Sequence, residues 1–130
     1  MRTPLGHAAL LVLLVHVLHD LDHLRQGDSA SAEVVGTAVF GWLALVVLLV
    51  LVGRGHRRAP AYAAGFGVVT AAGFVLVHVL PRWSAFSAPY SEADADALSW
   101  VLAILPIAAG VYLSARAVRE LRSPAAPAIA

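Results

Sequence analysis

Residues 5–24 read LGHAALLVLLVHVLHDLDHL, an apolar run that ends in a cluster of ionisable side chains. An α-helix needs about 20 predominantly apolar residues to cross the hydrocarbon core of a bilayer, and this run has that length. On a helix, positions i, i+3, i+4 and i+7 share one face, within an arc of about 100°. Four ionisable residues occupy these positions: His16, His19, Asp20 and His23. Because ionisable groups beside hydrocarbon are costly and usually functional, the stretch predicts a membrane helix that carries the functional centre.

The composition of the whole chain favours a membrane protein. Of its 130 residues 60% are apolar, and the mean hydropathy is +0.80, whereas a soluble domain of this size needs more polar surface. The apolar segments predict four transmembrane helices, over residues 5–24, 32–52, 60–80 and 97–117. We therefore expect an all-α integral membrane protein, a bundle of two helical hairpins. It would form one domain, 1–122, with a disordered C-terminal tail over 123–130.

Several functional classes are excluded by what the sequence lacks. The chain contains no cysteine, which rules out disulfides, thiolate metal sites and cysteine nucleophiles. It shows no phosphate-binding loop, nucleophile elbow or dinucleotide fingerprint, so whether it is an enzyme stays open. The arginines form small groups next to apolar segments, so we expect no nucleic-acid partner. The absence of lysine and asparagine, with abundant alanine, arginine and glycine, indicates the coding bias of a GC-rich, bacterial genome.

The arginines are distributed unevenly, and this predicts the orientation. In a four-span chain one side carries Arg2, Arg54, Arg57, Arg58, Arg116, Arg119 and Arg122. Only Arg25 and Arg82 fall on the other side. By the positive-inside rule we expect a multi-pass protein of the cell membrane with both termini cytoplasmic, so that the His/Asp cluster faces outward. Trp83, Phe86 and Tyr90 are interpreted as an aromatic belt at the outer interface.

A pentapeptide recurs in the chain. LVHVL stands at residues 14–18 and again at 76–80, which suggests a parallel internal repeat of the two hairpins. In such a repeat His16 and His78 occupy equivalent positions at similar depth. The second copy lacks the rest of the cluster, because Pro81, Arg82 and Ala85 stand where the first copy has His19, Asp20 and His23.

The cluster predicts a transition-metal site. Imidazole and carboxylate ligands together suit zinc, copper or iron, and histidines three or four residues apart on a helix can chelate one ion. The predicted metal ligands are His16, His19, Asp20, His23 and His78. Such a site would serve metal handling or metal-dependent membrane chemistry.

Three alternatives stay open at this point. His16 and His78 are also the obvious axial pair for a haem b held between helices. The His/Asp stripe is equally a candidate relay for a proton or cation pathway. Finally, the histidines are compatible with simple helix-to-helix hydrogen bonds in a non-catalytic subunit. Expected partners are the lipid bilayer and either a second copy of the chain or a larger membrane complex.

Overall fold

The computed structural model describes residues 3–27, 31–93 and 95–123, and the regular elements in these ranges are helical. They are α1 (Pro4–Gln26), α2 (Ala32–Gly53), α3 (Ala59–Phe74), the π-helical turn η1 (Val75–Val79) and α4 (Ala97–Arg122). With η1 counted as the end of α3, all four helices are long and apolar enough to cross a membrane. The predicted all-helical chain with four candidate spans is confirmed. From residue 124 on, the tail predicted to be disordered lies outside the described residues.

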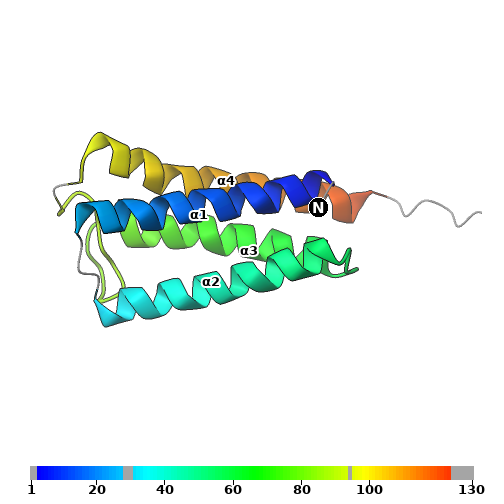
Figure 1. Ribbon diagram of the computed structural model, residues 1–130, viewed down its shortest axis with the longest axis horizontal. Coiled ribbons are helices and arrows are strands. Elements are labelled where there is room, and N and C mark those ends of the chain that lie inside the picture. Colours follow the sequence, from blue (N-terminus) through cyan, green and yellow to red (C-terminus); the bar gives the residue numbers. More distant parts are fainter. Residues whose placement is uncertain (1–2, 28–30, 94, 124–130) are drawn as a thin grey trace, which may run out of the picture.

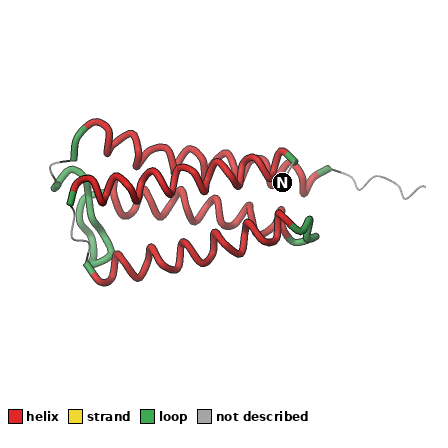
Figure 2. The backbone as a smooth tube through the Cα atoms, in the orientation of Figure 1, coloured by secondary structure: helices red, strands yellow, loops and turns green. Residues whose placement is uncertain are grey.

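The four helices run antiparallel to their chain neighbours, side by side in one elongated bundle (Figure 1). The start of α1, the short turn between α2 and α3, and the end of α4 lie at one end of it. The longer loop that leads into α4 lies at the other end (Figure 2). α4 packs extensively on both α3 and α1, whereas α2 touches α1 and α3 more sparsely, so α1 and α3 occupy opposite corners. The repeat, and the pairing of the helices as two equivalent hairpins, stay predictions.

Side-chain caps define where the helices begin. The side chains of Thr3, Ser31 and Asp96 each accept a hydrogen bond from the backbone N–H three residues later, at the starts of α1, α2 and α4. These caps satisfy donors that a helix start leaves unpaired. Pro4 occupies the first turn of α1, where its missing N–H costs nothing. Gly27, with φ of 66°, ends α1 in the left-handed conformation that glycine adopts without strain.

Small residues bring α3 and α4 into backbone contact. A Cβ atom added to Gly67 would collide with the carbonyl oxygen of Gly110, and one added to Gly110 would lie 2.6 Å from the carbonyl oxygen of Gly67. Beside this crossing the Ser114 hydroxyl donates a 2.8 Å hydrogen bond to the Ala64 carbonyl. Close approach through small residues, with a hydroxyl bond across the interface, is a characteristic way for apolar helices to associate.

The third helix ends differently from the prediction. It was expected to run over 60–80, but the α-helix stops at Phe74 and continues as the π-helical turn Val75–Val79. The N–H of Leu80 closes this wide turn onto the Val75 carbonyl at 3.0 Å. Pro81 follows and cannot continue a helix. A π turn rotates the residues within it relative to a regular helix, and such turns occur often at functional sites.

Replacement of Gly67 by alanine should destabilise the bundle. The new Cβ meets backbone, which cannot move aside, so Gly67→Ala should lower the free energy of unfolding by about 1–3 kcal/mol, the usual cost of overpacking. The matched control is Gly65→Ala on the same helix, where an added Cβ meets nothing within 4 Å. Thermal unfolding in detergent, followed by circular dichroism, measures both. Equal melting temperatures for the two variants would contradict the packing described for α3 and α4.

Candidate functional site

Three histidines meet inside the bundle near the end that carries the long loop. His19 and His23 lie one turn apart on α1, and His78 comes from η1. One ring nitrogen from each lies within 4.8 Å of the other two, and the Nε2 atoms of His19 and His23 are 3.0 Å apart. His19 and His78 are only 4% and 5% exposed, and His23 is half-buried. We call these three residues the three-histidine group.

The spacing of the three-histidine group suits one metal ion. Zinc–nitrogen bonds of about 2.0–2.1 Å in a tetrahedral site place the ligand nitrogens roughly 3.3–3.4 Å from one another. The Nε2 atoms of His19 and His23 are 3.0 Å apart, and one nitrogen from each of the three rings lies within 4.8 Å of the other two, close to this value. Small side-chain rotations would be enough to gather the three nitrogens around an ion.

His78 is oriented by the loop that follows it. Its Nδ1 lies 3.1 Å from the Ala88 carbonyl oxygen, and since a carbonyl can only accept, Nδ1 carries the proton. This leaves Nε2 with a lone pair for an ion. The loop is held against η1 by two more bonds, from the Ala88 N–H to the Val77 carbonyl at 2.9 Å and from the Tyr90 N–H to the His78 carbonyl at 3.0 Å. An oriented imidazole of this kind is typical of metal ligands in proteins.

A proline on α4 frees a carbonyl that faces His19. Pro106 has no N–H to donate to the carbonyl of Leu102 four residues earlier, so that carbonyl lacks its usual partner in the helix. This carbonyl lies near the His19 ring, but Nδ1 of His19 makes no hydrogen bond to any described residue.

Two aromatic rings enclose the three-histidine group. Phe74 packs edge-on against His19, with ring centroids 4.7 Å apart, and lies 5.6 Å from His78. Tyr90 packs against His78 at 4.7 Å, and its hydroxyl lies 3.4 Å from the Nε2 of His23. Tyr90 is 3% exposed, so it is part of the interior and no interfacial belt residue. Sequence reasoning missed this role because no periodicity relates a loop tyrosine to a helix face.

Two of the predicted ligands lie outside the three-histidine group. The Nδ1 of His16 hydrogen-bonds the Val12 carbonyl at 2.8 Å, and its ring packs edge-on against Phe74 and Trp42. A carboxylate oxygen of Asp20 accepts a 2.6 Å hydrogen bond from the Trp42 indole. The physical reason is Trp42 on α2, which fills the space beside this part of α1 and supplies a donor there. An arc of about 100° on one helix is wide enough to face two different neighbours.

A polar network next to the group joins the end of α1 to the start of α4. The carboxylate of Asp22, fully buried, accepts hydrogen bonds from Arg25 at 2.8 Å and from Gln26 at 2.7 Å. The guanidinium of Arg25 also reaches Asp96 and Ser99, each at 3.1 Å. The Ser99 backbone N–H holds the pKa of Asp96 below its usual range, so this carboxylate stays charged. Asp22 points off the predicted stripe, and its link to α4 through Arg25 was not predicted.

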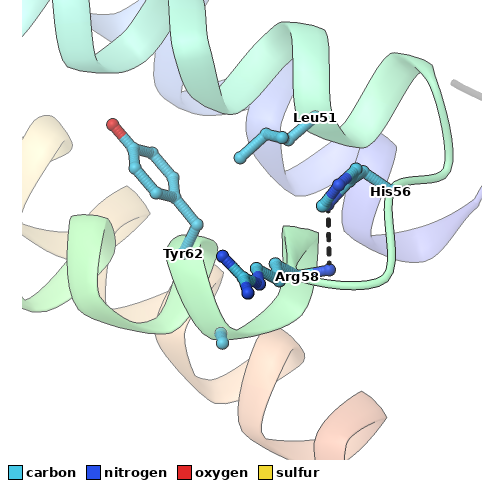
Figure 3. Close-up of a pocket in the computed structure, with 5 residues that line it drawn as sticks. Leu51, His56, Arg58 and Tyr62 are labelled. Carbon is cyan, nitrogen blue, oxygen red and sulfur yellow. Dashed lines mark hydrogen bonds between the residues drawn. The ribbon is translucent and has the colours of Figure 1, made fainter.

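A second feature lies at the opposite end of the bundle. An open pocket of about 390 Å³ lies between the end of α2 and the start of α3, lined by Leu51, His56, Arg58, Ala61 and Tyr62. Figure 3 shows how these side chains lie around it. His56 Nδ1 accepts a 3.1 Å hydrogen bond from the Arg58 N–H, and the Tyr62 hydroxyl donates to the Ala44 carbonyl. The lining is mainly apolar and offers one imidazole, unlike the convergence of three imidazoles at the other end.

No protein family, no curated protein and no solved structure matches this chain. The site is therefore characterised by its donor set and its geometry. Three imidazole nitrogens meet in an apolar interior, and one of the rings, His78, is oriented by a backbone carbonyl.

Proposed function

We propose that this is an integral membrane protein that binds one transition-metal ion through His19, His23 and His78. The observation that carries the proposal is the convergence of three ring nitrogens within 4.8 Å. Magnesium and calcium prefer oxygen ligands, whereas imidazole suits zinc, copper and iron. The donor set therefore favours these transition metals.

The environment of the group supports this proposal. The Nε2 atoms of His19 and His23 face each other at 3.0 Å, so at most one of them can carry a proton between them. Two buried imidazolium ions at this distance would repel strongly in an apolar interior. A bound cation would accept the lone pairs of both Nε2 atoms at once, and it would take the place of the proton that the two atoms otherwise share. The nearest acidic side chains of α1 are engaged with Trp42 and Arg25, so they do not compete for the imidazoles.

The three histidines come from the end of α1 and from η1, whereas Arg54, Arg57 and Arg58 belong to the turn between α2 and α3. That turn lies at the opposite end of the bundle from the loop before α4 (Figure 1). The positive-inside rule favours a cytoplasmic location for the arginine-rich end, and we therefore propose that the metal site lies near the outer surface of the cell membrane. Metal handling or metal-dependent chemistry at that surface is the role proposed.

The metal prediction is tested by elemental analysis of protein purified without chelators. Wild type should hold close to one transition-metal ion per chain. A His19→Ala, His23→Ala double variant should lose it and still insert, because two of three ligands are gone. The control is His7→Ala, at the exposed start of α1, which should keep the ion. If His16→Ala retains the metal ion, the three-histidine group is supported as the ligand set. If this variant loses the ion, the wider predicted set that includes His16 and Asp20 is supported.

Wild type that is metal-free and cannot be reloaded would contradict the proposal. An absorbance spectrum of the same sample separates the haem alternative, because an intense Soret band would instead support axial ligation by His16 and His78. A proton flux in vesicles without bound metal would support a relay along the histidine stripe.

The orientation is tested separately. A reporter fused after Arg122 should be active in the cytoplasm, because the arginines at that end resist translocation. A tag inserted at Ser91, an exposed residue of the loop before α4, should be accessible from outside intact cells. Labelling by an impermeant reagent reads out the tag, and lysed cells provide the control. An exterior reporter after Arg122 would place the metal site on the cytoplasmic side.

A further inference from the structure

We infer that Tyr90 is the fourth protein ligand of the metal, through its phenolate oxygen. The inference rests on the proposed function and adds the identity of the remaining coordination position. It changes the expected chemistry, since three imidazoles alone leave a position for water or substrate, whereas a fourth protein ligand closes the site.

The position of the hydroxyl carries the inference. It lies 3.4 Å from the Nε2 of His23, which is itself 3.0 Å from the Nε2 of His19. Neighbouring ligands in a tetrahedral site with bonds of about 2.0–2.1 Å are roughly 3.3–3.4 Å apart. The hydroxyl oxygen therefore stands at ligand spacing from one of the three histidines. The Tyr90 ring also packs against the other two, at 4.7 Å from His78 and 6.4 Å from His19.

Hydrogen bonds and ring contacts hold Tyr90 in place next to His78. The Tyr90 N–H bonds the His78 carbonyl at 3.0 Å, so the two residues are joined directly. The edge of Trp100, on α4, packs against the Tyr90 ring at 5.7 Å. At 3% exposure the tyrosine cannot swing out to solvent without breaking these contacts. A ligand held in this way needs little reorganisation when an ion arrives.

Charge balance favours a phenolate at this position. Three neutral imidazoles leave the full charge of a cation uncompensated in an apolar interior, which is costly. The two carboxylates of this part of α1 are occupied elsewhere, Asp20 with Trp42 and Asp22 with Arg25. Tyr90 is thus the group in contact with the three histidines that can supply a negative charge. On binding, the metal–oxygen bond replaces the O–H bond and the proton is released to solvent.

A closed site of three imidazoles and one phenolate has a distinct metal preference. An anionic oxygen ligand stabilises ions of higher charge, so we expect ferric iron and cupric copper to be held more tightly than their reduced forms. Such a site stores or relays a metal or an electron, and it does not offer an open position for hydrolysis.

The test is optical and uses the full chain. Purified wild type is loaded with ferric or cupric ion, and its visible absorption and resonance Raman spectra are recorded. We expect a phenolate-to-metal charge-transfer band and tyrosinate ring modes in wild type and in the control Tyr112→Phe, whose ring lies 45% exposed on α4. Tyr90→Phe keeps the aromatic packing and should lose the band, while the three histidines still bind the ion with lower affinity.

The outcomes separate the two proposals. Wild type that takes up no ion overturns the proposed metal function and the inference with it. Wild type that binds the ion but shows neither the band nor the tyrosinate modes overturns only the role of Tyr90. The same holds if Tyr90→Phe retains the band. The Raman measurement on wild type decides the point even if the variant folds poorly.

Discussion

A polar group inside an apolar helical bundle has to find its partner within the protein, because neither lipid nor packed side chains can replace water. In this structure three buried or half-buried polar groups have such partners. Asp20 is paired with the Trp42 indole, Asp22 with Arg25, and the Ser114 hydroxyl with a carbonyl of α3. The first and the last of these contacts join different helices, α1 with α2 and α4 with α3, whereas Asp22 and Arg25 both lie on α1. Arg25 extends this pair to the start of α4. In the three-histidine group the imidazoles contact one another, Tyr90 and a loop carbonyl.

The location of that group follows from the packing of the helices around it. The close glycine contact draws α3 and α4 together, and α1 packs on α4, which leaves α1 and α3 at opposite corners. Side chains that reach inward from opposite corners meet in the middle of the bundle. His19 and His78 do so, with ring centroids 4.9 Å apart. The long loop then folds back over this meeting point, bringing Tyr90 inside and orienting His78 through the Ala88 carbonyl.

Two departures from regular helix geometry lie beside the site. Pro106 leaves the Leu102 carbonyl, near the His19 ring, without its usual helical partner. The π turn ends α3, and the carbonyls of Val77 and His78 belong to this last turn, where a helix end leaves carbonyls unpaired. The N–H groups of Ala88 and Tyr90 bond these two carbonyls, which holds the loop against His78.

The sequence by itself determined the helical class, the four candidate spans and the presence of histidines within apolar helices, because hydrophobic length and helical spacing are local properties of the chain. It also brought His78 into consideration, through the repeated pentapeptide. Only the tertiary structure decided which ionisable residues meet. Trp42 on α2 engages Asp20 and contacts His16, and the loop after η1 carries Tyr90 into the interior. Such contacts depend on which helices are neighbours, and residues far apart in the chain leave no periodic signal of that arrangement.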